Sequence, residues 1–251
     1  MNTVVAVIPA RFGSTRLPGK ALADIAGVPM IVRVWQQTRK ARLLHRVLIA
    51  TDDERIASAI RDAGGEVEMT ASSHPSGTDR IAEVANRVPA DVYLNVQGDQ
   101  PFIAPEDIDA VVRIMTAEPG LSMATLGTPI VDFDEWRNSN KVKIVCDNQG
   151  YALYFSRSPI PFFREGTGVP PGALRHVAVY GYRRNFLLNF AALAQGYLEE
   201  TEKLEQLRAM EHGYRIRVVA SVAPSLEVDT PEDLARANME AGGQRTDSFN
   251  T

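Results

Sequence analysis

Short apolar runs alternate with amphipathic stretches through the first half of the chain. The runs have the length of strands, and the stretches between them place apolar residues three and four positions apart, as on one face of a helix. This alternation predicts βαβ units, and so an α/β fold with a wound, mostly parallel sheet and helices on both faces. The predicted strands are 4–8, 47–50, 67–70 and 92–96, and the predicted helices are 29–42, 53–63, 79–87 and 105–117.

The pattern changes after about residue 121. Four strand-like runs follow with few helical patterns between them, at 123–128, 142–146, 152–156 and 176–182, and they predict added antiparallel strands or a small subdomain. Proline and glycine concentrate in 157–172, which predicts a long loop of the kind that often binds or covers a ligand. The remaining predicted elements are helices over 186–194 and 202–211, a strand over 216–222 and a last helix from Pro231.

Charge and composition exclude several classes of protein. The 251 residues carry 27 Lys and Arg against 31 Asp and Glu, a net charge of −4, so a nucleic-acid-binding protein with a broad basic face is not expected. No apolar run approaches the roughly 18 residues of a membrane span, and the first residues lack the pattern of a secretory leader. The single cysteine, Cys146, is expected to pack as a small apolar residue. We therefore expect a cytoplasmic protein.

A basic loop directly follows the first strand. Arg11, Arg16 and Lys20 fall within ten residues, together with two glycines and the hydroxyl group of Ser14. Open α/β sheets bind ligands at the carboxyl ends of their strands, where glycine backbone N–H groups and basic side chains can hold phosphate oxygens. The loop therefore predicts a polyphosphate site. The alternative is a solvated basic loop whose glycines only turn the chain.

Better-known catalytic and nucleotide-binding motifs are absent. Five residues separate Gly13 from Gly19 and Ala21 follows Lys20, which does not match a Walker A loop, and no G-x-G-x-x-G opens the first helix. The four histidines have no paired metal-ligand spacing, and there is no G-x-S-x-G sequence. P-loop, dinucleotide-binding, zinc-hydrolase and serine-hydrolase chemistry therefore have no support.

Two acids stand at the ends of apolar segments. Asp99 follows the strand 92–96 and Gly98, and Asp229 lies just before the last helix. Magnesium prefers oxygen ligands and usually takes one or two protein carboxylates together with phosphates and water. Asp99 and Asp229 are thus candidate magnesium ligands beside a polyphosphate, although Asp99 could also be a simple turn residue. The neighbouring acids of the Pro-Glu-Asp sequences at 105–107 and 231–233 are better explained as helix-start residues.

Many short motifs in order identify the chain as similar to the 3-deoxy-manno-octulosonate cytidylyltransferase (CMP-Kdo synthetase) family. The resemblance covers about residues 3–240. Its motifs are IPAR at 8–11, STRLPGK at 14–20, HPSGTDR at 74–80, NVQGD at 95–99, ALYFSR at 152–157, YGYR at 180–183, EKLEQLR at 202–208 and VDTPEDL at 228–234.

The resemblance implies a Rossmann-like nucleotidyltransferase fold and a reaction. CTP and the eight-carbon acid sugar Kdo would give CMP-Kdo and pyrophosphate with Mg²⁺, for lipopolysaccharide biosynthesis, in a homodimer. The implied catalytic residues are Lys20, Arg16, Asp99 and Asp229, the last two also binding the metal. The implied nucleotide-binding residues are Arg11, Ser14, Arg16, Lys20, Ser76, Thr78, Arg80 and Gln97. The implied sugar-binding residues are Arg157, His176, Tyr182, Glu205 and Gln206.

The change of pattern after about residue 121 and the polar end of the chain, taken with the resemblance, predict a division of the chain. Residues 1–120 would form the nucleotide-binding core, 121–200 the added strands, sugar-site loop and dimerisation subdomain, 201–241 a return to the core and 242–251 a flexible tail.

Two positions depart from the family pattern and leave the acceptor sugar open. Gln100 stands where Glu is common after the Gly-Asp pair, and Glu227 stands where Gly is common before Val228-Asp229. An additional acid near the sugar could favour an amino-substituted acceptor such as 8-amino-Kdo. Another ulosonate, another sugar nucleotidyltransferase activity and a non-catalytic nucleotide-binding protein are the remaining alternatives.

Overall fold

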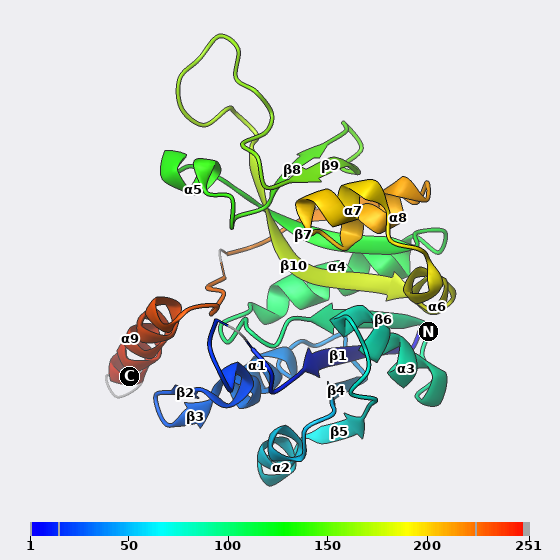
Figure 1. Cartoon of the computed structure of the whole chain (residues 1–251), viewed down its shortest axis with the longest axis vertical. Helices are drawn as coiled ribbons and strands as arrows, with labels where there is room; N and C mark the ends of the chain where they lie inside the picture. The colour runs from blue at the N-terminus through cyan, green and yellow to red at the C-terminus, as the bar shows by residue number, and fades with distance from the viewer. Residues whose placement is uncertain (1, 15, 224, 248–251) are drawn as a thin grey trace.

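The computed structural model describes residues 2–14, 16–223 and 225–247. Within these ranges the main sheet has nine strands, seven of them in the order β11-β7-β10-β6-β1-β4-β5 (Figure 1). β10 is antiparallel to both of its neighbours, β6 and β7, while the other pairs of this row are parallel. The predicted α/β class with a mostly parallel sheet is confirmed. The strands are β1 (Val4–Ala10), β4 (Arg46–Thr51), β5 (Glu66–Met69), β6 (Val92–Val96), β7 (Met123–Pro129), β10 (Leu174–Arg183) and β11 (Ile216–Ala220).

Strands from the second half of the chain are part of this sheet. β7 and β10 continue it beyond β6, and β8 (Lys143–Cys146) and β9 (Ala152–Ser156) branch from β10 as an antiparallel pair. The separate hairpin of β2 (Asp24–Ile25) and β3 (Val28–Pro29) follows the short 3₁₀ helix η1 (Lys20–Leu22). An apolar pattern along the chain indicates that a segment is a strand but not which strand it pairs with. The sequence therefore predicted these strands but not their order in the sheet.

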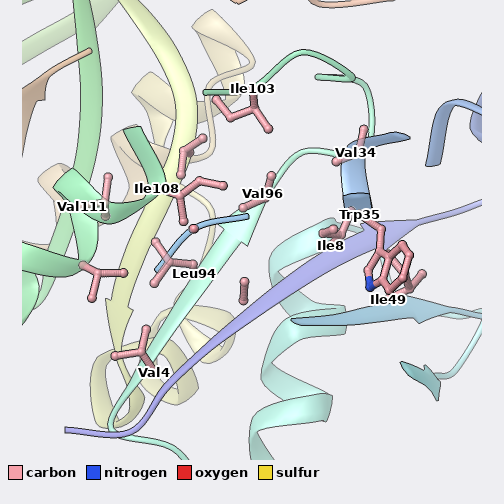
Figure 2. Close-up of a cluster of buried hydrophobic side chains, with 14 of the residues drawn as sticks. Val4, Ile8, Val34, Trp35, Ile49, Leu94, Val96, Ile103, Ile108 and Val111 are labelled. Atoms are coloured by element: carbon pink, nitrogen blue, oxygen red, sulfur yellow. The ribbon is translucent and has the colours of Figure 1, made fainter. Parts of the chain in front are cut away.

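Helices cover both faces of the sheet and pack on alternate side chains of its strands. In β1, Val4 and Ile8 join a first core, beneath α1, α2 and α4 (Figure 2), whereas Val5 and Val7 join a second core, beneath α3 and α6. This follows from the two-residue period of a strand, whose successive side chains point to opposite faces. These helices are α1 (Met30–Thr38), α2 (Glu54–Asp62), α3 (Gly77–Arg87), α4 (Pro105–Ala117) and α6 (Arg184–Ala192).

Some predicted helix boundaries are wrong. The helix predicted over 202–211 is confined to α8 (Gln206–Glu211). A separate short helix, α7 (Tyr197–Glu202), precedes it and ends where Lys203 takes a left-handed conformation with a φ of 53°. α1 ends at Thr38 rather than at residue 42. The short α5 (Phe133–Arg137) is capped by Asp132, whose side chain accepts a hydrogen bond from the Glu135 backbone.

The last helix, α9 (Pro231–Asp247), lies far along the chain but packs beside the β2–β3 hairpin (Figure 1). Ala237 and Ala241 of α9 join Ile25 and Met30 in a small core, and Asn238 accepts a hydrogen bond from the Ala26 backbone at 2.8 Å. The helix continues through residues 242–247, so the predicted tail is helical there; residues 248–251 lie outside the described part.

The structure also bears on the expectations for Cys146 and for membrane-spanning segments. Cys146 is half-buried beside the second core, and burial raises the pKa of its thiol. Within the described ranges, none of the helices combines the length and the apolar character needed to cross a bilayer.

Candidate functional site

Lys20 contacts both candidate metal ligands, Asp99 and Asp229. Its Nζ donates to Asp99 Oδ2 and to Asp229 Oδ1, each at 2.7 Å, and the Arg16 guanidinium lies 3.1 Å from the same oxygen of Asp229. Lys20 and Asp229 lie 209 positions apart in the chain. The structure thus brings the basic loop and both candidate metal ligands to one point.

Close backbone packing at the end of β1 makes this convergence possible. A Cβ atom on Gly98 would lie 3.2 Å from the Pro9 carbonyl oxygen, and one on Gly77 would lie 3.0 Å from the Pro9 ring. Glycine at both positions therefore lets the loops after β6 and before α3 approach the strand end. The backbone N–H of Val228 also donates to the Asp99 carbonyl oxygen at 2.9 Å, which ties the two acid-bearing segments together.

A helix cap holds Asp229 in place. At the start of α9, the Asp233 carboxylate accepts hydrogen bonds from the backbone N–H groups of Asp229 and Thr230, each at 3.1 Å, and the Thr230 hydroxyl accepts one from the Asp233 backbone. Asp233 thus serves the helix start, as predicted, and leaves the Asp229 carboxylate directed toward Lys20.

Lys20 and Asp229 each stabilise the charged form of the other. Burial alone would lower the pKa of Lys20, but Asp99 and Asp229 outweigh it and raise that pKa above its ordinary value. Burial would raise the pKa of Asp229, but Lys20 and Arg16 hold it below its ordinary value. Lysine and carboxylate are therefore both charged at neutral pH.

A first pocket of about 350 Å³ opens beside this cluster at the carboxyl end of β1. It contains seven of the eight predicted nucleotide-binding residues, namely Arg11, Ser14, Arg16, Lys20, Ser76, Arg80 and Gln97. Arg80 is almost completely buried and pairs with Asp52 at 3.0 Å. The eighth predicted residue, Thr78, is buried and is not in the lining; its hydroxyl donates to Glu205 at 2.5 Å.

A second pocket of about 590 Å³ lies on the other side of the same cluster. Arg157, His176 and Gln206 line it, as the sugar-site prediction expects. Tyr182 and Glu205 are not in its lining. Tyr182 is 1% exposed and stacks with Phe186 and Phe190 in the second core, and Glu205 is held by Thr78. Tyr182 thus packs in the core from β10 and does not face the pocket. The alternating pattern of a strand does not show which of its two faces binds a ligand.

The two pockets share one wall. Arg16, Gln97, Asp99 and Asp229 line both of them, so the Lys20-linked acids stand between the two spaces. Two molecules bound in the two pockets would therefore meet at these side chains.

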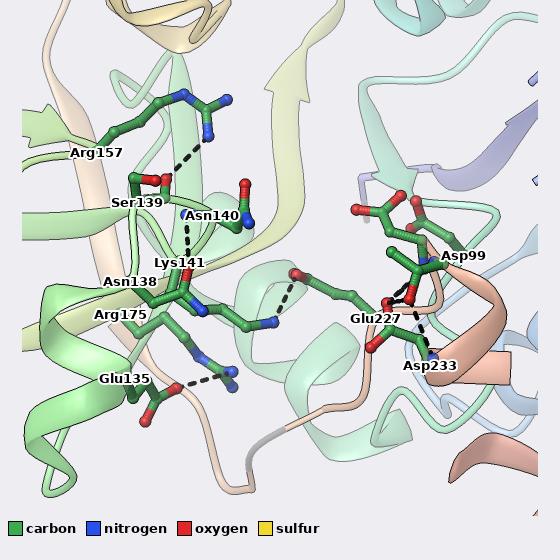
Figure 3. A network of polar contacts seen from close by, with 12 residues as sticks. Asp99, Glu135, Asn138, Ser139, Asn140, Lys141, Arg157, Arg175, Glu227 and Asp233 are labelled. Atoms are coloured by element: carbon green, nitrogen blue, oxygen red, sulfur yellow. Dashed lines mark hydrogen bonds and ion pairs between the residues drawn. The ribbon is translucent and has the colours of Figure 1, made fainter. Parts of the chain in front are cut away.

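His176 and Arg157 contribute to the second pocket in different ways. Burial, assisted by the charge of Arg175, lowers the pKa of His176 to about 3, so its ring is neutral, and its Nε2 lies 2.9 Å from the Thr125 hydroxyl. The Arg157 guanidinium donates to three backbone carbonyl groups, including Glu202 O at 2.7 Å and Ser139 O at 3.1 Å (Figure 3). His176 can thus exchange hydrogen bonds with hydroxyl groups as a neutral ring.

Sequence reasoning missed the loop that carries much of the second pocket. Ser139, Asn140 and Lys141 line it, and the Lys141 ammonium lies 3.4 Å from the Glu227 carboxylate, reaching across the space drawn in Figure 3. A polar loop with no motif gave no signal for this role. Glu227, noted as a departure from the family pattern, also lines the pocket, and burial raises the pKa of its carboxyl although Lys141 opposes the shift.

The other departure, Gln100, is fully buried next to these residues. Neither its amide nitrogen nor its amide oxygen has a hydrogen-bond partner within the described part of the chain. Glutamine at this position leaves Asp99 without a second carboxylate directly beside it in the chain.

The donor set fits magnesium bound together with phosphates. Asp99 and Asp229 already converge on one cationic nitrogen, with 2.7 Å contacts on both sides, so both can reach a common cation. Among the described residues, no group of three or more His, Cys, Asp or Glu side chains could hold a metal. Two carboxylates alone suit Mg²⁺, which keeps several waters and takes the remaining oxygens from substrate phosphates.

Comparison with known proteins gives one consistent result. The model of the cytidylyltransferase family matches residues 5–216. A 3-deoxy-manno-octulosonate cytidylyltransferase of Trichlorobacter lovleyi is 52% identical over 93% of this chain and 96% of its own length, and one of Geobacter sulfurreducens is 51% identical over 93% and 97%.

Solved structures agree. A CMP:2-keto-3-deoxy-manno-octonic acid synthetase complexed with CTP superposes with a TM-score of 0.91 at 42% identity, covering 96% of this chain and 99% of that one. A 4-diphosphocytidyl-2C-methyl-D-erythritol synthase from Anaerococcus prevotii, 13% identical with a TM-score of 0.64, shares the fold. The predicted family is confirmed: the chain belongs to the 3-deoxy-manno-octulosonate cytidylyltransferases.

Proposed function

We propose that this protein transfers CMP from CTP to the anomeric hydroxyl of Kdo and releases pyrophosphate, supplying an activated sugar for lipopolysaccharide. The observation that carries the proposal is the shared wall of the two pockets, formed by Arg16, Gln97, Asp99 and Asp229. A group-transfer enzyme needs two substrates whose reacting atoms meet, and this wall is the meeting point of two adjacent pockets.

The first pocket suits CTP. Four cationic side chains line it, Arg11, Arg16, Lys20 and Arg80, and they suit a triphosphate, whose negative charge they can balance in part. Bound beside the shared wall, the α-phosphate would face the second pocket, and the β- and γ-phosphates would lie along the basic loop.

The second pocket suits an acid sugar. Arg16, Lys141, Arg157 and Lys203 line it together with Gln206 and the neutral His176. Basic groups favour a sugar carboxylate, and neutral amide and imidazole groups can both donate to and accept from the hydroxyl groups of a polyol.

The reaction then needs no covalent enzyme intermediate. The anomeric oxygen of Kdo forms a bond to the α-phosphorus while the bond to the bridging oxygen of pyrophosphate breaks, and the hydroxyl proton leaves to solvent. Arg16 and Lys20 stabilise the charge that develops on pyrophosphate.

We propose that Asp99 and Asp229 hold Mg²⁺ during this reaction. When bound, Mg²⁺ supplies charge neutralisation at the α-phosphate and makes the attacking hydroxyl more acidic. The α9 cap holds the backbone of Asp229, and the Val228–Asp99 backbone contact ties the two acid-bearing segments together, so both carboxylates are already placed at the shared wall.

Glu227 is the one observation in favour of an amino-substituted acceptor, since its carboxylate lines the second pocket. Lys141 at 3.4 Å already balances that charge, so an additional ammonium group on the sugar is not required. We therefore favour Kdo. A competition between Kdo and 8-amino-Kdo under limiting CTP tests the choice: CMP-Kdo should dominate, and preferential consumption of the amino sugar would reverse the assignment.

We also propose a cytoplasmic homodimer, since CTP is a cytoplasmic substrate and several large apolar side chains are exposed in the second half of the chain. Phe162 is 85% exposed in the segment that projects between β9 and β10 (Figure 1), and Val131, before α5, and Leu153, on β9, are also well exposed. Exposed apolar side chains favour an apolar partner, and a second copy of this chain would supply one.

A pyrophosphate-release assay tests the proposed reaction. The wild-type protein with CTP, Mg²⁺ and Kdo should release pyrophosphate, and omission of the sugar, the metal or CTP should each stop it. Replacing CTP by ATP, GTP or UTP, or Kdo by sialic acid or a sugar 1-phosphate, should lower the rate strongly. A thermal shift with CTP but no turnover with any ulosonate would instead support a non-catalytic nucleotide-binding protein.

A further inference from the structure

Lys143 of β8 is a fully buried lysine whose bonds all go to backbone carbonyl groups. Its Nζ donates to the carbonyl oxygens of Asn138 at 2.8 Å, Lys141 at 2.5 Å and Arg157 at 2.6 Å, and its side chain is 0% exposed. An ammonium group has three N–H donors, so this arrangement uses all of them.

The three acceptors belong to two different walls of the second pocket. Asn138 and Lys141 bracket the loop whose Ser139 and Asn140 line the pocket, and Arg157 lines it from the end of β9. Lys143 therefore fixes the loop before β8 against the residue that follows β9. Within the loop, hydrogen bonds from the Lys141 and Asn140 backbone to Asn138 close a tight turn.

Hydrogen bonds from Arg157 connect these two walls of the second pocket to a third. Its guanidinium donates to Ser139 O at 3.1 Å, to Glu202 O at 2.7 Å and to Lys203 O at 3.4 Å, and Lys203 lines the pocket. The Arg157 carbonyl oxygen, held by Lys143, and the Arg157 side chain thus connect the loop, β9 and the turn between α7 and α8. Figure 3 shows Arg157 directed toward Ser139 at this side of the pocket.

The buried ammonium group of Lys143 costs free energy, and the groups that it satisfies are backbone carbonyls of the pocket wall. Burial lowers the pKa of Lys143, with the charge of Arg157 adding to the effect, so its positive charge is held at a cost. An apolar side chain of similar length would fill the same space without removing a charge from water, but it would leave three carbonyl groups of the pocket wall without their donor.

We propose that Lys143 is a positioning residue for the sugar acceptor: it preorganises the loop 138–142 and Arg157 as walls of the second pocket. The inference rests on the proposed function of that pocket. Lys143 does not line either pocket and does not touch the reacting atoms, so its effect should appear in binding of the sugar and not of CTP.

Steady-state kinetics of Lys143→Met test the inference. The KM for Kdo should rise at least tenfold, while the KM for CTP should stay within about twofold of wild type. The matched control is Ile60→Ala, which empties a fully buried core position on α2 beside β4 and β5, at the opposite edge of the sheet from β8. That variant should lower the melting temperature without changing the ratio of the two KM values.

The outcomes separate the two proposals. If wild-type protein does not convert Kdo, the proposed function fails. If wild type is active and Lys143→Met keeps the wild-type KM for Kdo, or raises both KM values equally, Lys143 is merely structural and the inference is overturned.

A measurement on the wild-type protein covers the case in which Lys143→Met does not fold. The preorganised loop predicts that the backbone amide of Lys141, bonded to Asn138 O at 3.0 Å, exchanges with deuterium slowly before any sugar is added. Exchange as fast as that of the exposed residues Phe162, Arg164 and Glu165 would show a loop that Lys143 does not hold, and would overturn the inference.

Discussion

Replacing Lys20 by Met gives the sharpest prediction about the shared wall, because one side chain contacts both acids. Its Nζ lies 2.7 Å from a carboxylate oxygen of Asp99 and of Asp229, and the side chain is only 16% exposed. The substitution keeps the length of the side chain and removes the charge. Two consequences follow, one for turnover and one for metal binding.

Turnover should fall strongly. At an effective dielectric constant of about 20, two unit charges at about 4 Å interact by roughly 4 kcal/mol. Loss of one preorganised donor to a developing anion costs about 2.7–4 kcal/mol, or roughly 10²–10³ in kcat. The two values agree, so Lys20→Met should lose about two to three orders of magnitude in kcat for pyrophosphate release.

Metal binding in the absence of CTP should become tighter. Lys20 occupies the space between the two carboxylates, so a divalent cation must displace it. Without the ammonium group, the acids lack that counter-ion, and a gain of only about 1.4 kcal/mol would tighten Mn²⁺ binding tenfold. Titration calorimetry or Mn²⁺ electron paramagnetic resonance on the protein without nucleotide measures this directly.

The control is Lys40→Met, which removes an exposed lysine that donates only to Gln37 among the described hydrogen bonds. It should change neither property. Turnover of Lys20→Met within threefold of wild type would show that the basic loop is scaffolding, and unchanged or weaker Mn²⁺ binding would show that Lys20 does not compete with the metal.

Three further predictions concern the acids, His176 and the projecting segment. Asp99→Asn and Asp229→Asn should each abolish pyrophosphate release with an unchanged circular dichroism spectrum; near wild-type turnover in either would remove that acid from the mechanism. Burial holds the pKa of His176 at about 3, below the unfolded value of about 6.5, so the unfolded chain takes up its proton first as pH falls. Stability should then be lost between about pH 6.5 and 3, by up to about 1.4 kcal/mol per pH unit. Urea unfolding from pH 7 to 4 should show a smaller loss in His176→Gln, and equal slopes would contradict the argument. Phe162→Glu should convert a dimer into a monomer in analytical ultracentrifugation; a wild-type monomer would contradict the proposed assembly.

The sequence predicted most of the helices and strands, because each of these elements depends mainly on residues that are close together in the chain. The apolar run of β6 and the Pro-Glu-Asp start of α4 carry their own signals, and both elements occur as predicted. The break at Lys203 has no such signal, because the residue that takes the left-handed conformation there is a lysine and not a glycine.

In the candidate site, too, some residues could be predicted from the sequence and others could not. Arg16, Lys20 and Asp99 could be found because strand ends collect at one edge of a sheet. Tyr182 and Ser139 could not be assigned, since the burial of the first and the exposure of the second depend on β10 and β8 pairing with distant strands. Lys143 reads as a polar residue in a strand, and only its three carbonyl contacts identify its position.

The measurement that tests the central claim most directly is ³¹P nuclear magnetic resonance of the wild-type protein with CTP, Mg²⁺ and Kdo. The two-pocket arrangement predicts that the three CTP signals disappear as equal amounts of a sugar phosphodiester and pyrophosphate form. CTP that stays intact, or that yields CMP and pyrophosphate at the same rate without the sugar, would contradict the claim that the shared wall joins a nucleotide to an acid sugar.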